Sequence, residues 1–283
     1  MKKRPNIAKQ IREASELLRD FMQESLGEIG DDLITSLMSA ARRATPAERT
    51  RLANALTPKG VVAYRTALRE ELAAIAVDAI EQARREVPKA KKVKLAETIT
   101  LSDYDRLPPS LARSIQNRAE LLVNKQIGDL LSVIQFSYAT SEDETDSMDT
   151  VETDIRESAV GWLEGTAIES GAALNAATTI NSARNAFFFD DDVLEEIDAF
   201  EFVNGDPVTE VCQDLAGTIF GKDDAESARY QPPLHWNCKS SIQPILKGNL
   251  GDREIEKLKP SKKALDSQVL FSDAAENCGC MTD

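Results

Sequence analysis

Histidine and aromatic residues are scarce in this chain. One of its 283 residues is a histidine, and aromatic side chains make up 5% of the sequence. A large aromatic core is therefore excluded, and a helical body rich in alanine and leucine is the natural expectation. The chain also contains only four cysteines. So few cysteines in a chain of this length do not indicate a disulfide framework.

Long apolar runs are missing as well. No segment is apolar over the roughly 20 residues that a bilayer-spanning helix needs. Residues 1–6 are charged and lead into no apolar run, so they do not resemble a signal peptide. We expect no contact with a membrane, and a protein that stays in the compartment where it is made.

Positive charge is in the minority. The chain has 34 Lys and Arg against 48 Asp and Glu, which gives a net charge of −14 and a pI near 4.7. A dedicated nucleic-acid binder needs a cationic face to displace counterions from phosphates, so this class is disfavoured. One basic cluster surrounds Pro88 and consists of Arg84, Arg85, Lys89, Lys91, Lys92 and Lys94. We interpret it as a solvated linker, with phosphate binding as the alternative.

Helical periodicity dominates residues 6–87. Apolar residues, Leu17 among them, recur there at helical spacing. Asp31 and Asp32 are expected to begin a second helix. A further long helix is expected to start at Thr57 and to stop before Pro88.

A short helix is predicted between these segments by its first residues. Thr45 is a suitable N-cap, Pro46 stands at the first helical position, and Glu48 follows three residues after the cap. This order is typical of a capping box with proline at N1.

The middle of the chain is also predicted to be mainly helical. Residues 88–107 are a basic-to-polar connector with a short strand expected around 95–101. Helices are expected from 108 to about 138 and, as one continuous element, from 150 to about 189. The second is rich in glycine and alanine, which allows close packing against a neighbouring helix.

The sequence changes its character after Phe189. Partial alternation over 197–203 and the short run at 241–246 predict strands, and the apolar pair at 219–220 precedes a further turn. The expected fold is mainly α with a small C-terminal α+β module. The expected domains are a helical region with a basic linker (1–107), central helices (108–189), the α+β module (190–247) and a polar, loosely held tail (248–283).

The segment from Pro232 to Ser241 concentrates unusual residues. It holds the only histidine, His235, in an H-x-x-C pair with Cys238. Pro232 and Pro233 lack an N–H and fix φ, so the segment is expected to be extended rather than helical. Asp206 and Cys212 form a second such group upstream, and the fold is expected to bring the two groups together.

The order of these residues resembles the phage Mu protein F-like, or SPP1-type, head morphogenesis family. The motif residues are Arg184 within 182–186, then Asp206, Thr209, Cys212 and Gly217, and then Pro232, Pro233, His235, Trp236, Asn237, Cys238 and Lys239. Lys239 stands where the family usually carries arginine. The resemblance covers residues 150–247, and the helices before it resemble no family specifically.

Members of this family are minor capsid proteins of tailed phages. The resemblance implies a structural protein of the virion, located in the head interior or at the portal vertex, and in the host cytoplasm during assembly. The implied partners are the portal protein and the major capsid or scaffold proteins. Proximity to packaged DNA is implied too, and an acidic protein is compatible with sitting near DNA without being captured by it.

The two groups of special residues are a candidate zinc site. Cys212, His235 and Cys238, with Asp206 as a fourth ligand, offer the thiolate and imidazole groups that zinc prefers. The alternative is a packing role, in which the cysteines are small buried hydrophobes and Asp206 caps its own turn. Asn237 is expected to bond nearby backbone and hold the turn.

Two other functional classes stay open. The first is a metal-dependent hydrolase or nuclease that uses His235, with Asp206 as the orienting carboxylate. The second is a helical adaptor that binds another assembly component through residues 1–140. We expect no enzyme activity, because only one of the groups that catalysis requires can be identified.

Overall fold

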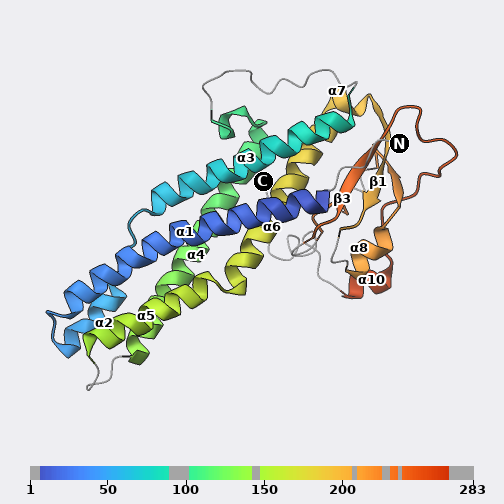
Figure 1. Cartoon of the computed structure of the whole chain (residues 1–283). Coiled ribbons are helices and arrows are strands. Elements are labelled where there is room, and N and C mark those ends of the chain that lie inside the picture. Colours follow the sequence, from blue (N-terminus) through green and yellow to red (C-terminus); the bar gives the residue numbers. More distant parts are fainter. Residues whose placement is uncertain are drawn as a thin grey trace. The chain divides into compact units, whose positions relative to one another are not determined.

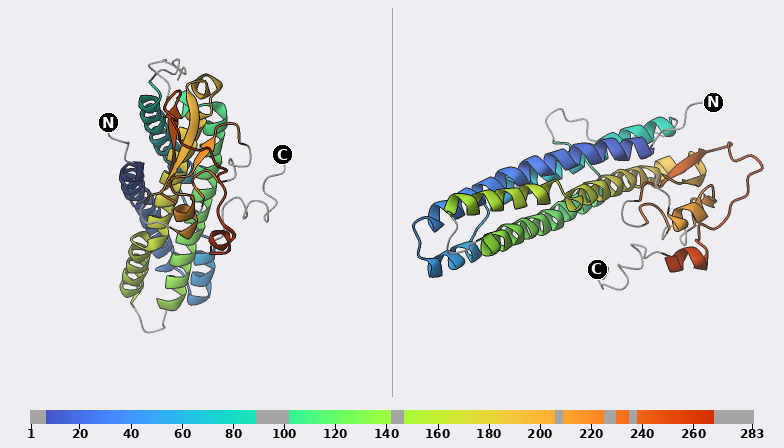
Figure 2. Two further views of the ribbon diagram at one scale, coloured as in Figure 1. Left: turned by 90° about the vertical axis from the view of Figure 1, so that its right-hand side faces the viewer. Right: turned by 60° about the horizontal axis from the view of Figure 1, so that its bottom comes forward.

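The chain is mainly α-helical, with a small α+β module near its C-terminus, and the predicted fold class is confirmed. A computed structural model describes residues 7–88, 102–141, 147–205, 209–224, 230–234 and 238–267. Figure 1 and Figure 2 show long helices over the N-terminal two thirds and a sheet of three strands after them. Among the described residues, no helix is both long and apolar enough to cross a bilayer.

The described residues form two compact units that alternate along the sequence. The sheet unit takes its residues from Met1–Ser15, Leu72–Arg113 and Ala173–Asp283, and the helical unit from Glu16–Glu71 and Ser114–Ala172. Four long helices contribute residues to both units. The sequence predicts four consecutive domains instead, because periodicity marks where a helix ends but does not indicate which segments it packs against.

The helices cover most of the described chain. Their bounds are α1 Ile7–Ala41, α2 Pro46–Asn54, α3 Val61–Glu86, α4 Pro109–Ser141, α5 Met148–Leu163 and α6 Thr166–Phe188, with a 3₁₀ turn at Tyr104–Arg106. The strand predicted around 95–101 lies outside the described residues. Tyr64 and Gln126 join α3 to α4 inside the helical unit, through a buried hydrogen bond of 2.7 Å from the phenol to the side-chain amide oxygen.

Helix α1 is continuous, so the break predicted at Asp31 is wrong. Gly30 lies in the middle of the helix, where an added Cβ would lie 3.7 Å from Leu130 of α4. Asp31 pairs with Arg156 at 2.7 Å and does not cap a helix. Leu17, which we placed on the apolar stripe, is 71% exposed. Tertiary contacts, rather than local helix propensity, therefore decide the roles of Gly30 and Asp31.

The helix predicted over 150–189 is in fact two helices, α5 and α6. They are separated at Gly165, where a Cβ would lie 3.1 Å from the carbonyl oxygen of Trp162. The carbonyl oxygen of Leu163, one of those that a helix end leaves without an intrahelical partner, accepts a hydrogen bond of 3.0 Å from the Gln23 side chain. The sequence predicts a packing role for the glycines of this stretch, whereas Gly165 stands at a chain turn.

The start of α2 follows the predicted capping pattern. The Glu48 carboxylate accepts hydrogen bonds from the backbone N–H of Thr45 at 2.8 Å and from its hydroxyl at 2.7 Å. The backbone bond is the larger of the two causes that lower the pKa of Glu48. Helix α3 begins at Val61, later than the predicted Thr57.

The sheet contains the two predicted strands and a third one, where the sequence predicted only the approach to a turn. They are β1 Ile197–Val203, β2 Ile219–Gly221 and β3 Ser241–Leu246, all antiparallel in the order β2-β1-β3. Within the described residues, three short helices accompany them: α7 Asp191–Leu194, α8 Glu210–Leu215 and α10 Lys262–Ser267. Phe200 of β1 stacks on Phe220 of β2 with 5.7 Å between ring centroids, and Phe188 of α6 lies 6.1 Å from Phe200. Aromatic rings, scarce elsewhere, thus form the centre of this module.

The polar segment after β3 packs on the module, where the sequence predicted a loosely held tail. The N–H of Glu256 donates to the carbonyl of Ile219 at 2.7 Å, and Leu258 is fully buried. The Asp214 carboxylate of α8 accepts the N–H of Ser261, just before α10. This packing was missed because it depends on few apolar residues, widely spaced in a polar segment.

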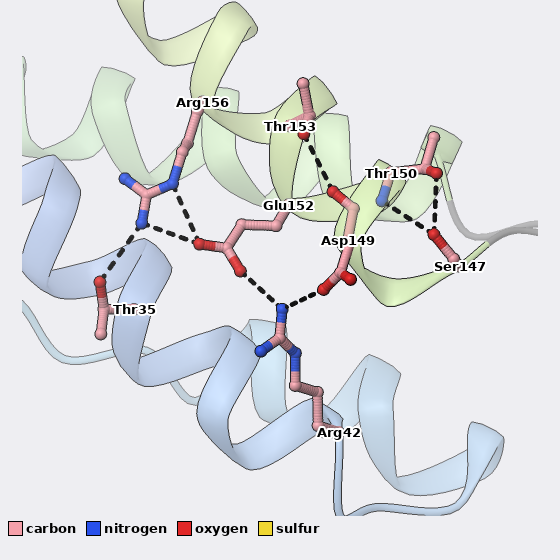
Figure 3. A network of polar contacts seen from close by, with 8 residues as sticks. All are labelled: Thr35, Arg42, Ser147, Asp149, Thr150, Glu152, Thr153 and Arg156. Atoms are coloured by element: carbon pink, nitrogen blue, oxygen red, sulfur yellow. Dashed lines mark hydrogen bonds and ion pairs between the residues drawn. The ribbon is translucent and has the colours of Figure 1, made fainter.

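An ion-pair network ties α5 to α1 inside the helical unit (Figure 3). Glu152 is its centre, since its two carboxylate oxygens accept from Arg42 at 2.9 Å and from Arg156 at 2.9 Å. Arg42 also reaches Asp149 at 2.6 Å. Arg156 also donates to Thr35 at 3.4 Å. Because these side chains are exposed or partly exposed, solvent screens the network.

Substitution of Glu152 tests how much this network contributes to the stability of the fold. Glu152→Gln removes the charge that two arginines share, and we expect a loss of less than about 1 kcal/mol at low salt. Screening should shrink the loss at about 1 M salt. Asp149→Asn is the matched control, because its side chain is 88% exposed and it pairs with one arginine. Urea midpoints at both salt concentrations measure the effect, and a loss independent of salt would contradict the assignment.

Candidate functional site

Helix α6 holds the described parts of the Pro232–Ser241 stretch and the start of β3, within the sheet unit. Helix α8 contacts the same stretch through Cys212 and Cys238. The residues that make the contacts lie on α6 at positions 181, 184 and 185, which share one helix face because they are three and four residues apart.

Arg184 is the most deeply buried charged residue of the site. Its side chain is 1% exposed and forms two hydrogen bonds with the carboxylate of Glu86, at 2.5 and 3.0 Å. A third bond, of 3.3 Å, goes to the carbonyl of Ile242 in β3. The guanidinium carbon lies 5.0 Å from the ring centre of Phe188, within cation–π range. Arg184 therefore fixes the end of α3 and the start of β3 to α6.

Two asparagines of α6 hold the backbone of the H-x-x-C segment. Asn181 is 1% exposed, and its amide nitrogen donates to the carbonyls of Ser240 and Ala177, both at 3.1 Å. Asn185 donates to the carbonyl of Pro232 over a longer 3.5 Å. The segment is thus held by α6 at both of its ends.

Cys212 and Cys238 lie side by side in the interior of the module. Their sulfur atoms are 3.7 Å apart, both residues are buried, and they form no disulfide. Cys212 sits in the first turn of α8, where its N–H donates to the Thr209 hydroxyl at 3.4 Å. This bond caps the helix with the side chain that commonly does so. Thr209 therefore helps to set the position of the Cys212 thiol.

The surroundings of Cys238 favour its thiolate form. A hydrogen bond from Cys212 is the largest cause that lowers the pKa of Cys238, to about 6. Burial acts in the opposite direction, and backbone bonds from Leu234 and Ser240 and the Ser240 hydroxyl add to the lowering. A thiolate is both a nucleophile and a metal ligand.

Close backbone approaches explain the glycines of the module. A side chain on Gly205 would overlap the backbone of Lys239, so only glycine fits where the two segments meet. Gly217 has φ +82°, in the left-handed region, and its N–H donates to the carbonyl of Phe202 at 2.9 Å. The Pro232–Pro233 peptide bond is cis, with Pro232 buried.

Four of the predicted site residues lie outside the described residues: Asp206, His235, Trp236 and Asn237. The structure brings Cys212 and Cys238 together and places Thr209 at the N–H of Cys212, whereas Arg184 bonds to Glu86 and Ile242. Lys239 is half-buried against Gly205. Within the described part of the chain, no group of three or more His, Cys, Asp or Glu side chains is placed to hold a metal ion.

Sequence reasoning missed Asn181, Glu86 and Ser240. The spacing of Asn181, Arg184 and Asn185 on an otherwise apolar helix was a usable signal, because polar groups on a buried face need partners. Glu86 left no local signal, since its partner lies 98 residues away.

Substitution of Arg184 tests the buried ion pair. Arg184→Met leaves the Glu86 carboxylate buried without its partner, which we expect to destabilise the protein by about 3–5 kcal/mol. The double variant Arg184→Met with Glu86→Met should recover much of this loss, because no unpaired charge remains. Chemical denaturation of both singles and the double completes the cycle. Additive losses would show that the two side chains act independently.

Substitution of Asn181 tests the hold on the segment. Asn181→Ala leaves the buried Ser240 carbonyl without this donor and should cost about 1–3 kcal/mol. Asn185→Ala is the matched comparison. It removes a longer hydrogen bond from a more exposed residue, so it should lower the free energy of unfolding by less. Hydrogen exchange at residues 238–246 should rise in the first variant, and equal exchange in both would contradict the assignment.

Comparisons of the chain with models of protein families, with curated proteins and with solved structures found no match. The function is therefore inferred from the resemblance of the motif residues and from the contacts that these residues make. Those contacts are made to the main chain. Arg184, Asn181 and Asn185 each donate a hydrogen bond to a carbonyl of the Pro232–Ser241 segment or of β3.

Proposed function

We propose that this chain is a minor capsid, or head morphogenesis, protein of a tailed bacteriophage. It acts in head assembly at or near the portal, within the virion and, during assembly, in the host cytoplasm. Its partners are the portal protein and the major capsid or scaffold proteins, and it lies close to packaged DNA. The motif resemblance over residues 150–247 supports the proposal.

One observation carries it beyond resemblance. Two of the described motif residues hold main chain: Arg184 donates to the carbonyl of Ile242, and Thr209 caps α8. Catalytic side chains point toward a substrate, whereas the hydrogen-bonding groups of Arg184 and Thr209 stabilise the fold. Residues with this role fix the shape of the module. A subunit that docks in an assembly needs such a fixed shape.

The net charge fits the same role. A chain with 14 more negative than positive charges is repelled by DNA over distances of about a Debye length, roughly 8–10 Å at physiological salt. Such a protein can face packaged DNA without being captured by it. A helical adaptor with another partner shares this property, so the partner itself must be tested.

Particle composition tests this proposal. In the phage that encodes the chain, mass spectrometry of purified procapsids and virions should detect it in at least one particle, and co-expression should join it to the portal protein. Arg184→Met should reduce incorporation severalfold, because the docked module is destabilised. Glu152→Gln, a surface change, is the matched control and should be incorporated normally.

Two results would overturn the proposal. The first is absence of the chain from both particles. The second is substrate turnover by the purified protein that His235→Ala abolishes while the fold is retained, since this identifies the hydrolase alternative.

A further inference from the structure

The two buried thiols of the module lie in contact. The sulfur atoms of Cys212 and Cys238 are 3.7 Å apart, and both thiols are free. A disulfide joins its sulfurs at about 2.05 Å, so the two atoms must approach each other by roughly 1.7 Å. If both side chains move, each sulfur shifts by less than about 1 Å. A disulfide needs these two sulfur atoms and no further ligand.

The fold keeps the two thiols adjacent. The N–H of Cys212 donates to the Thr209 hydroxyl, and Asn181 of α6 holds the carbonyl of Ser240, two residues after Cys238. The two cysteines are 26 residues apart in sequence, so their meeting is a tertiary feature. Because both segments are held, each sulfur meets the other at a high effective concentration. This favours a bond within the chain over a bond to a separate thiol.

The surroundings of Cys238 suit the sulfur that reacts first. Its sulfur accepts hydrogen bonds from the Cys212 thiol, from the backbone of Leu234, and from the backbone and hydroxyl of Ser240. Donors of this kind stabilise the charged form of an acid, here the thiolate. The thiolate is the form of cysteine that attacks an oxidant. Cys238 is therefore assigned as the attacking sulfur, and Cys212 as the thiol that completes the bond.

Burial restricts which oxidants reach the pair. Cys238 is 1% exposed and Cys212 is 2% exposed. A bulky disulfide such as oxidised glutathione has to bring its own sulfur against the attacking thiolate, and poor access slows that exchange. Hydrogen peroxide is close to water in size and oxidises thiolates to sulfenic acids. A small hydroperoxide is therefore the class of oxidant that fits.

We propose that Cys212 and Cys238 are a reversible redox pair whose disulfide locks α8 onto the stretch that leads into β3. The Cys238 thiolate attacks one oxygen of hydrogen peroxide, the O–O bond breaks, and a sulfenic acid forms. The hydroxide that leaves takes up the proton lost earlier by the Cys238 thiol. The Cys212 sulfur then attacks the Cys238 sulfur, the S–O bond breaks, and water leaves with the Cys212 proton. Two thiols thus lose two electrons, and the peroxide is reduced to two water molecules.

Peptide mapping of the wild-type chain is the direct test. The reduced chain is freed of reductant, treated with hydrogen peroxide, and alkylated at its remaining thiols. Trypsin places Cys212 in peptide 185–222, Cys238 in 230–239 and the other two cysteines in 264–283. Mass spectrometry should find the first two peptides linked, with the loss of two hydrogens, and dithiothreitol should release them. Absence of this link from oxidised wild-type protein would overturn the proposal.

Cysteine variants test the order of the two steps. The double variant Cys278→Ser with Cys280→Ser keeps only the proposed pair and should form the same link. Adding Cys212→Ser leaves Cys238 without its partner, so dimedone, which traps sulfenic acids, should label Cys238 after peroxide treatment. Adding Cys238→Ser instead should give severalfold less label, on Cys212. Equal labelling of the two would contradict the assigned roles, and loss of the link from the double variant would contradict the pairing.

Hydrogen exchange tests the lock. The disulfide closes a loop of 26 residues and restricts local opening of the two segments that it joins. Exchange at the amides of α8 should therefore slow by about tenfold or more in the oxidised double variant, and recover on reduction. Unchanged exchange in protein that carries the link would overturn the lock. The redox pair does not depend on the assembly role, so either proposal can fail without the other.

Discussion

The sheet unit depends on one buried ion pair, between Arg184 of α6 and Glu86 at the end of α3. Removing two charges from water costs several kcal/mol each, and only good geometry with further hydrogen bonds offsets that cost. Arg184 meets this condition with two bonds to Glu86, one to Ile242 and the face of Phe188. A chain that folded without this contact would bury an unpaired charge, so the pair selects one arrangement of α3, α6 and β3.

The remaining parts of the site follow from that arrangement. With α6 fixed on β3, Asn181 reaches the Ser240 carbonyl, and Ser240 in turn lies against the Cys238 sulfur. Gly205 has no side chain, so the backbone at this position approaches the backbone of Lys239 closely. Backbone contacts therefore bring the two thiols together.

Local patterns were sufficient to predict elements but not their partners. The strands at 197–203 and 241–246 were predicted at their observed bounds, because alternation and turn residues are local signals. The continuity of α1 through Asp31 was missed because Asp31 pairs with Arg156 of α5, which is distant in sequence. The break at Gly165 was missed because glycine also occurs inside helices, as Gly30 and Gly161 do here. For the site, the pairing of Cys212 with Cys238 could be expected from the motif, whereas Glu86 could not.

The interleaving of the two units sets the order in which they can form during synthesis. Residues of the helical unit end at Ala172, so all of them have emerged before most of the sheet unit exists. The sheet unit contains both the first described residues of α1 and the strands that follow Phe188, so it joins segments that lie far apart in the sequence. Loop closure of this length is entropically costly and slow. A nascent chain therefore passes through a stage with one finished unit and exposed apolar ends of α1 and α3, where chaperones can act.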